Sequence, residues 1–459
     1  MFAGEEMKRI LVLIIFVCIV LLSAGCGIGQ KDVAGSDSSV GVKFVRQIVA
    51  EDNSTSRTIM WQSDVRKAYS VEYRLSDLAE GDTQQKTNAK SSSGAGVADI
   101  KKEQISVQKS GRGAGGILTQ AAIECSFKEG KGDYIQYQAQ LQSLQPNSIY
   151  EYRIVTEKNK GTWHSLQTDG GDSFTALIFP DSQSSDYSGW ESLVRAAQKR
   201  HPAAELFINM GDLVDNGQDA SQWRAWLGSV EPFSSELAFA PVIGNHEAYS
   251  LEWKMTPPKA YTQLFAVPEN GLPKYKRQFY SFDYGPVHFT VLDTNFHEAQ
   301  GWQPHLLADE LRWLEQDLAK SKARWKIVLQ HRDVFMYAFS KESGRPERAT
   351  FFLDFSRQLM PLYEKYNVDA VLSAHLHTYR RRLPLRNFAP AEDGITYILT
   401  GVAGNVRYPK LWGDFAWDAA RAPQPETANY MTMEVDENRL LFKAFLPDGK
   451  QFDEIEIKK

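Results

Sequence analysis

Hydrophobic and polar residues alternate along the first third of the chain with the two-residue period of half-buried β-strands. Segments 57–61, 68–74 and 148–155 follow this pattern, and aromatic side chains occupy one face of the last segment. A turn-forming run at 144–147, which contains a proline and an asparagine, precedes it. These features predict a small β-sandwich over residues 44–169.

The pattern changes after the glycine pair at 170–171. Apolar runs of strand length then recur at 174–179, 206–210, 239–243, 287–292, 326–329, 370–372 and 397–399. Helical periodicity separates several of them, most clearly at 310–318, where three leucines share one face. Alternating strands and helices predict an α/β domain over residues 172–455.

Two segments lack either period. Residues from about 80 to 116 are rich in Gly, Ser, Lys and Gln, which predicts a long and partly disordered loop inserted in the sandwich. Residues 27–43 are polar, with Gly, Ser and Asp, and are predicted to form a tether.

The first 26 residues have the pattern of a targeting leader. A short basic run at 7–9 precedes an apolar segment at 10–22, and small residues then lead to Cys26, as in a bacterial lipobox. We expect an exported, lipid-anchored protein of the bacterial cell surface. The alternatives are cleavage near Gly25, which would give a secreted protein, and an uncleaved anchor. Two glutamates before Met7 fit a signal sequence poorly, so Met7 is a candidate true start.

Composition further narrows the class of protein. The chain has 459 residues, which predicts two or three domains, and 42% of them are hydrophobic, enough for a substantial core. Its formal net charge of -5 argues against a nucleic-acid partner. The three cysteines are Cys18, Cys26 and Cys125, so a processed chain would keep no intramolecular disulfide within it.

Ligand-type residues follow the apolar runs of the α/β region. Each of five runs is followed closely by one of them: Asp181, Asp212, Asn245, His331 and His375. His246 and His377 lie beside two of these, so four of the nine histidines fall in these blocks. Since ligands gather at the carboxyl ends of strands in open α/β sheets, we expect one shared site.

Carboxylate, amide and imidazole side chains together are typical ligands of Zn, Mn or Fe. Two such ions need a bridging group, and Asp212 is the natural bridge because each carboxylate oxygen can hold one ion. A metal pair can lower the pKa of a bound water and neutralise phosphate oxygens. His246 follows a ligand directly, so its side chain is expected to point elsewhere and to assist the substrate by donating a proton.

The blocks Gly211-Asp212, Gly244-Asn245-His246-Glu247, His331 and His375-Leu376-His377 resemble, in this order, the calcineurin-like metallophosphoesterase superfamily. The preceding sandwich, which ends near residues 163–168, is similar to the fibronectin-III-like N-terminal domain of purple acid phosphatases, and residues 400–404 resemble that family's glycine-rich strand end. The resemblance implies a metallophosphoesterase core of two mixed β-sheets flanked by helices. It spans residues 44–455.

The resemblance also implies roles. Asp181, Asp212 and His377 would hold one metal ion, and Asp212, Asn245, His331 and His375 the other. A metal-bound hydroxide would attack phosphate monoesters, with His246 assisting the leaving group.

The chain departs from the family pattern at the first metal. Purple acid phosphatases have a tyrosine ligand where this chain has Asp215, and other members have a histidine where it has Gln183. Asp215 could bind the metal directly or through water, or could support or cap a neighbour instead. Gln183 could bind through its carbonyl oxygen. Ala374 replaces a usual glycine, a small change.

Other residues carry weaker signals of function. We expect Glu247 to be structural. The run Tyr379 to Arg382 could attract phosphate or form a solvated basic surface. Four tryptophans are expected to pack at the rim of the site: Trp190, Trp223, Trp302 and Trp412.

We therefore predict an exported, acid-phosphatase-like hydrolase of small phosphate monoesters, with two metal ions. One alternative is a phosphodiesterase or pyrophosphatase that acts on nucleotides or envelope phosphodiesters. The other is a non-catalytic surface binding protein.

Overall fold

The structure begins with short strands that pack around aromatic side chains. The computed structural model describes residues 37–76 and 116–459, all within one unit, Ala34–Lys459. The predicted leader, most of the predicted tether and nearly all of the predicted insertion lie outside these residues. Within the described ranges, no helix combines the length and the apolar character that crossing a membrane requires.

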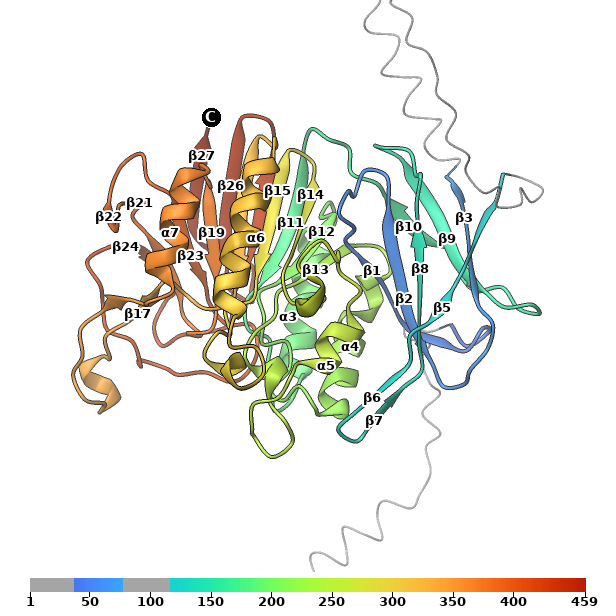
Figure 1. Ribbon diagram of the computed structural model, residues 1–459, viewed down its shortest axis with the longest axis horizontal. Helices are drawn as coiled ribbons and strands as arrows, with labels where there is room; N and C mark the ends of the chain where they lie inside the picture. Colours follow the sequence, from blue (N-terminus) through green and yellow to red (C-terminus); the bar gives the residue numbers. More distant parts are fainter. Residues whose placement is uncertain (1–36, 77–115) are drawn as a thin grey trace, which may run out of the picture. The chain divides into compact units, whose positions relative to one another are not determined.

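The N-terminal strands form two layers around a buried core (Figure 1). They are β1 (Val42–Ile48), β2 (Arg57–Ser63), β3 (Ser70–Leu75), β4 (Leu118–Ala121), β5 (Ile123–Glu124), β6 (Phe127–Glu129), β7 (Gly132–Tyr134), β8 (Gln136–Leu141), β9 (Ile149–Val155) and β10 (His164–Gln167). One layer has the order β10-β9-β3-β4, and β1, β2, β8 and β5 pair in the other. Trp61, Val71, Tyr152 and Leu166 fill the space between them. The alternating pattern thus placed its aromatic residues correctly.

One sandwich sheet continues into the α/β region. Strand β1 pairs in parallel with β13 (Ala238–Pro241), with Gln47 opposite Ala238 and Ile48 opposite Phe239. The result is a ten-stranded sheet, β27-β26-β25-β11-β12-β13-β1-β2-β8-β5. The two regions therefore share backbone hydrogen bonds, which ties the sandwich to the larger region.

This continuity corrects one expectation. The pattern at 57–61 predicts a half-buried strand, but every residue of β2 is buried. Ile59 and Trp61 pack into the sandwich core, whereas Met60 packs into the core of the α/β region. A strand that is buried on both faces needs apolar or paired polar residues throughout. The alternating pattern alone does not show that the second face of β2 packs against the α/β region.

All seven predicted apolar runs form strands of two mixed sheets, which confirms the predicted core architecture. The ten-stranded sheet adds β11 (Phe174–Phe179), β12 (Leu206–Asn209), β25 (Tyr430–Val435), β26 (Arg439–Phe445) and β27 (Gln451–Lys458). The seven-stranded sheet contains, in order, β14 (Tyr280–Tyr284), β15 (Val287–Leu292), β16 (Trp325–Gln330), β19 (Ala370–Ser373), β23 (Thr396–Thr400), β20 (Tyr379–Arg382) and β24 (Asp418–Arg421). Short ribbons are made by β17 (Phe335–Met336) with β18 (Phe351–Phe352) and by β21 (Leu385–Arg386) with β22 (Ala389–Pro390).

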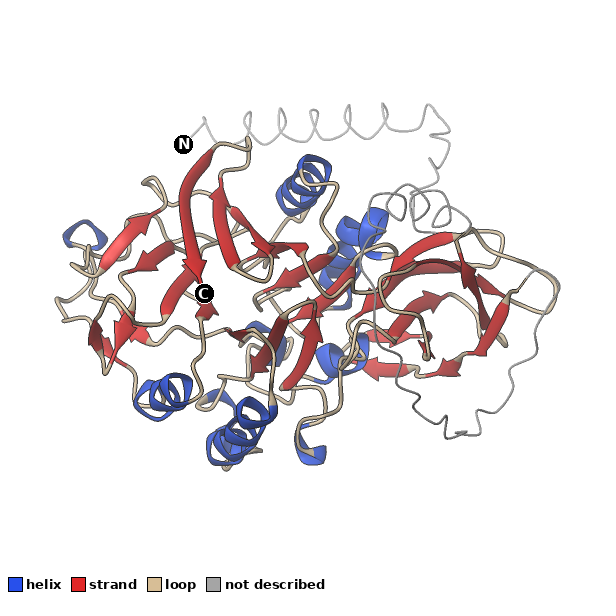
Figure 2. Ribbon diagram, turned by 90° about the horizontal axis from the view of Figure 1, so that it is seen from above, coloured by secondary structure: helices blue, strands red, loops and turns tan. Residues whose placement is uncertain are grey.

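The helices cover these sheets (Figure 2). They are α3 (Ser188–Arg200), α4 (Ala220–Ser234), α5 (Lys259–Leu264), α6 (Leu306–Lys320) and α7 (Ser356–Lys365), with 3-10 turns η1 (His246–Ala248), η2 (Pro273–Tyr275), η3 (Glu298–Gly301) and η4 (Lys341–Ser343). On β16, Val328 faces the cluster that holds Leu314 of α6 and Leu359 of α7. Ile327 and Leu329 face the cluster that holds the ten-stranded sheet. The seven-stranded sheet is therefore covered on both faces.

The basic run in β20 has neither predicted role. Arg380 and Arg382 are each about 1% exposed, and they pair with Asp418 and Asp333 respectively. A guanidinium can be buried when a carboxylate neutralises it, so these two arginines are engaged within the fold rather than offered to a phosphate or to solvent. Likewise Trp190 in α3 and Trp223 in α4 are fully buried rather than at a rim. Both tryptophans lie on helices that pack into the large hydrophobic core, and the local sequence does not show this packing.

Candidate metal centre

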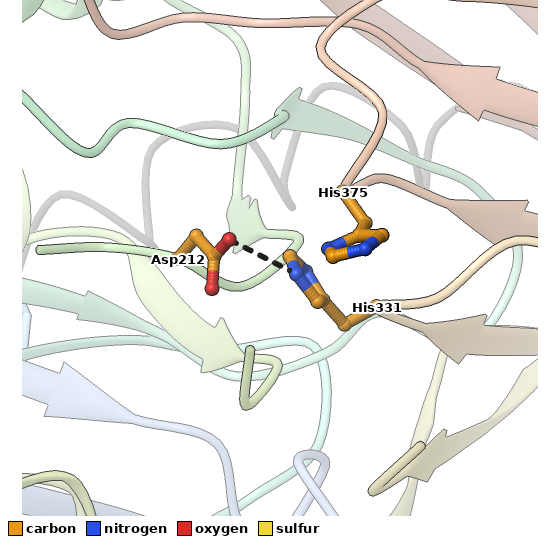
Figure 3. A group of neighbouring side chains, drawn as sticks. All are labelled: Asp212, His331 and His375. Carbon is orange, nitrogen blue, oxygen red and sulfur yellow. Dashed lines mark ion pairs between the residues drawn. The ribbon is translucent and has the colours of Figure 1, made fainter. Parts of the chain in front are cut away.

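The predicted ligands meet where strands of both sheets end. Asp181 follows β11, Asp212 follows β12, Asn245 and His246 follow β13, His331 follows β16, and His375 and His377 follow β19. Asp212, His331 and His375 form one group whose ligand atoms lie within 4.8 Å of one another (Figure 3). Asp181, Asp212 and His377 form a second group of the same size. The two groups share Asp212, the arrangement expected of a bridging carboxylate.

Distances within the groups are short. The Nε2 atom of His331 lies 3.1 Å from Oδ2 of Asp212, and Nε2 of His377 lies 3.3 Å from Oδ2 of Asp181. The amide oxygen of Asn245 lies 3.3 Å from Nε2 of His331. Asn245 therefore joins the first group, although it is neither a carboxylate nor a histidine.

Backbone carbonyls orient the imidazoles. Nδ1 of His331 lies 2.9 Å from the carbonyl oxygen of Met210, and Nδ1 of His377 lies 2.6 Å from that of Val406. A carbonyl only accepts, so each Nδ1 carries a proton, which leaves each Nε2 as the ring nitrogen that could bind a metal ion. Partners of this kind fix the tautomer of histidine ligands.

The local backbone is strained at three of these residues. Asp212, His375 and His377 have φ values of 49°, 73° and 51°, in the left-handed region that non-glycine residues rarely adopt. The chain also approaches itself closely: a Cβ on Gly244 would lie 2.2 Å from Oδ1 of Asp212, and one on Gly211 would lie 2.5 Å from Nδ1 of His331. The glycines before Asp212 and Asn245 are thus required by space, and strain of this kind clusters at functional sites.

Glu247 holds the loops together. Its carboxylate accepts hydrogen bonds from the backbone N–H groups of Asp212, Leu213, Val214 and Gly244, at 2.7–3.4 Å. The side chain is about 1% exposed. It links the loop after β12 to the loop after β13, which is a structural role.

Asp215 lies against His246 and belongs to neither ligand group. Its carbonyl oxygen is 2.6 Å from Nδ1 of His246, and its carboxylate Oδ1 is 3.5 Å from the same atom. The backbone N–H of His246 donates to Oδ1 of Asp212 at 2.8 Å. Since Nδ1 is engaged, Nε2 is the ring nitrogen left to face a substrate. Of the two roles considered for Asp215, the supporting one matches this geometry.

Two buried polar groups indicate that the centre fits metal ions. Nδ1 of His375 has no hydrogen-bond partner among the described residues, and neither do the amide oxygen and nitrogen of Gln183. Gln183 is fully buried, and its backbone N–H donates to the carbonyl of Asp212 at 2.8 Å. An unpaired buried amide is unfavourable by about 1–3 kcal/mol, so a metal ion or its water is the partner that this chemistry calls for. Unlike Asp215, which His246 engages, Gln183 keeps both amide atoms without a partner among the described residues and so is the stronger candidate to complete the group around Asp181.

The electrostatics of the site keep two of its histidines neutral and raise the pKa of a third. Burial lowers the pKa of His375 well below its usual range and that of His377 to about 4, so both rings are neutral ligands. Burial also raises the pKa of Asp181. Burial would likewise raise the pKa of Asp212, but the neighbouring His331 and His246 hold that pKa below its usual range. Burial opposes the charged form of His331, yet Asp212 raises its pKa to about 9.

A cavity of about 350 Å³ opens at the centre, lined by Asp212, His246, His375 and His377. Sequence reasoning missed Arg332, which also lines it. Nη1 of Arg332 lies 3.0 Å from Nε2 of His375, and its other end pairs with Glu298. Its position directly after His331 was the one available signal. A guanidinium beside the metal ligands suits phosphate oxygens.

Comparison with known families agrees with this geometry. The model of the calcineurin-like phosphoesterase family matches residues 164–379, and that of the purple acid phosphatase N-terminal domain matches residues 43–168. Together they span the sandwich and all of the loops that carry the candidate ligands.

Curated relatives are distant and match only in part. Purple acid phosphatase 23 of Arabidopsis thaliana is 29% identical over 204 residues, 44% of this chain and 41% of that protein. The probable inactive purple acid phosphatase 27 of the same plant is 26% identical over 310 residues, a match that covers 58% of this chain and 49% of that protein. Acid phosphatase type 7 of Mus musculus is 25% identical over 305 residues, a match that covers 59% of this chain and 66% of that protein. The matched region thus spans roughly half the length of such relatives.

Solved structures show the same fold. A purple acid phosphatase isolated from seeds of yellow lupin, Lupinus luteus, superposes with a TM-score of 0.70 at 17% identity, over 91% of this chain and 74% of that one. The structure of PhoD superposes with a TM-score of 0.57 at 13% identity, over 94% and 90%. With these two domains in the expected order, residues 43–379 of this chain are purple acid phosphatase-like, with an N-terminal domain of that family followed by a calcineurin-like phosphoesterase domain.

Proposed function

We propose that this protein hydrolyses phosphate monoesters with two metal ions, drawn from Fe, Zn or Mn, held around Asp212. The observation that carries the proposal is the pair of Asp/His groups that share this carboxylate beside His246. When bound, the ions would supply Lewis-acid activation of water and would neutralise the charge of the phosphoryl group. Gln183 is the proposed additional ligand near Asp181.

The protein's own residues would position and protonate the substrate. Nδ1 of His246 donates to the carbonyl of Asp215, which fixes the ring with Nε2 free for the leaving-group oxygen. Arg332, which contacts the proposed ligand His375, supplies donors for the phosphoryl oxygens. The strained loop backbones keep these groups in place before substrate arrives.

A substrate panel tests this proposal. The metal-loaded protein is assayed in parallel with an aryl phosphate monoester, a bis-aryl phosphodiester and inorganic pyrophosphate. We expect the highest kcat/KM on the monoester. A higher kcat/KM on the diester or on pyrophosphate would contradict the monoesterase assignment and would identify a phosphodiesterase or a pyrophosphatase instead. A fully metal-loaded protein that turns over none of the three would be a binding protein instead.

We further propose that the protein is exported and lipid-anchored through Cys26. The basic run, the apolar segment and the small residues before this cysteine support the proposal. Labelling of expressing bacterial cells with a radioactive fatty acid should mark the wild type and leave Cys26→Ala unlabelled. Equal labelling of both would contradict lipidation at Cys26.

A further inference from the structure

A second cavity adjoins the metal centre. It measures about 770 Å³, against about 350 Å³ for the cavity at the metal ligands. Phe339, Arg348 and Trp412 line both cavities. The second cavity therefore begins where the first one ends, and it is too large to serve a phosphoryl group alone.

The shared wall is rigid and tied to the metal ligands. The rings of Phe339 and Trp412 stack with centroids 5.6 Å apart, and their backbones form a β-bridge. The indole N–H of Trp412 donates to the carbonyl of Leu376 at 2.7 Å. Leu376 lies between His375 and His377, so this hydrogen bond fixes the wall relative to the metal centre.

Arg348 is the charged group of this wall. Its guanidinium carbon lies 3.7 Å from the centroid of the Phe339 ring and 5.6 Å from that of Trp412. Its Nε donates to the carbonyl of Tyr337 at 3.0 Å. Among the described residues no carboxylate pairs with it, so a fixed guanidinium presents its Nη groups to an anion.

The rest of the second cavity is also basic. Five basic and three acidic side chains line it. Glu342 neutralises Lys410, and Asp414 neutralises Arg421. The remaining bases, which are Lys341, Arg345 and Arg348, make no ion pair within the described chain, and Glu347 is the one acid left to oppose them. The net field there attracts anions.

We propose that the second cavity binds a second anionic group of the substrate, so that the preferred monoesters carry another phosphate on the leaving group. The scissile phosphate would lie at the metal ligands and Arg332, and the distal one at Arg348, with Arg345 and Lys341 adding charge. This inference rests on the proposed function and narrows it to doubly phosphorylated substrates.

Two matched substrates test the subsite. They are the bisphosphate of a linear diol and the monophosphate of the same diol. After correction for its second scissile group, the bisphosphate should have a kcat/KM roughly tenfold or more above the monophosphate, since its distal phosphate gains a charge-assisted hydrogen bond to Arg348. Arg348→Gln should remove most of this ratio. Arg357→Gln is the matched control, because Arg357 is an exposed arginine beside an aromatic ring outside both cavities.

Binding separates failure of the subsite from failure of the hydrolase. Calorimetry of the metal-loaded protein uses a linear alkane diphosphonate and the matching alkyl monophosphonate, in which carbon replaces the ester oxygen. The diphosphonate should bind roughly tenfold more tightly to the wild type and to Arg357→Gln, but not to Arg348→Gln. Equal affinities in the wild type would overturn the subsite. Tighter diphosphonate binding without turnover of any ester would leave the subsite standing and overturn the hydrolase.

Discussion

The imidazole of His246 is held by Asp215, whose carbonyl oxygen lies 2.6 Å from Nδ1 and whose carboxylate lies 3.5 Å from it. The carboxylate is close enough to stabilise an imidazolium, whereas it lies in neither metal-ligand group. Asp215→Ala should therefore lower kcat by about 10- to 100-fold while metal content stays at the wild-type level.

Elemental analysis and steady-state kinetics on the same preparation check this prediction. Asp215→Asn keeps the size of the side chain and should lie between the wild type and Asp215→Ala. If either variant lost metal in proportion to its activity, Asp215 would be a ligand instead.

Gln183 should affect the metal-free and the metal-loaded protein in opposite directions. Gln183→Met removes a buried amide without a partner, so the metal-free form should gain about 1–3 kcal/mol in its free energy of unfolding. The same change should weaken metal binding by about 10- to 100-fold, because a ligand or its supporting group is lost. Denaturant titrations with and without metal measure both effects. An unchanged metal affinity would exclude Gln183 from the centre.

The buried pair of Arg380 and Asp418 should stabilise the seven-stranded sheet. Their side chains are 1% and 6% exposed, and the contact is 2.6 Å. Arg380→Met should lower the free energy of unfolding by about 3–5 kcal/mol, because Asp418 is left as an uncompensated buried charge. Arg386→Met, which breaks an exposed pair with Asp393, should lower it by less than about 1 kcal/mol. Similar losses in both variants, measured by urea denaturation, would contradict this account.

His288 predicts how stability depends on pH. Burial opposes its charged form, but Asp283 at 2.6 Å from Nδ1 and Asp317 at 3.0 Å from Nε2 raise its pKa to about 9. The raised pKa means that the folded state holds the proton more tightly than the unfolded one. This contribution, at most about 3 kcal/mol, is therefore complete below about pH 6.5 and is lost as the pH rises towards 9.

Unfolding midpoints at about pH 6 and about pH 9, for the wild type and for His288→Asn, measure this contribution. The wild type should exceed the variant more at the lower pH, and the difference should shrink on going to the higher pH. A difference that grows with pH would show that His288 is neutral in the folded protein.

The strands and the candidate ligand positions could be predicted from the sequence because each has a local signature. Apolar runs mark the strands, and ligand-type side chains directly after them mark the site. The positions of Asp181 and Asp212 could be derived in this way, since the parallel strands β11 and β12 end at the same edge of one sheet. His331 follows a strand of the other sheet, so its place beside them depends on how the two sheets pack.

Long-range contacts were out of reach of the same reasoning. That β2 is covered on both faces depends on the pairing of β1 with β13, which no local pattern encodes. The burial of Arg380 depends on Asp418, 38 residues away. Arg348 comes from a segment without strong periodicity, and its place beside the metal centre follows from the fold alone.

The central claim is that Asp212 holds two metal ions that are required for phosphoester hydrolysis. Metal content and aryl phosphate turnover are therefore measured on the wild type, on Asp212→Asn and on the control Asp393→Asn, an exposed aspartate whose side chain is 79% accessible. We predict about two ions per chain in the wild type and the control, and in Asp212→Asn a loss of metal with at least a roughly hundredfold fall in kcat. Wild-type turnover and metal content in Asp212→Asn would contradict the account.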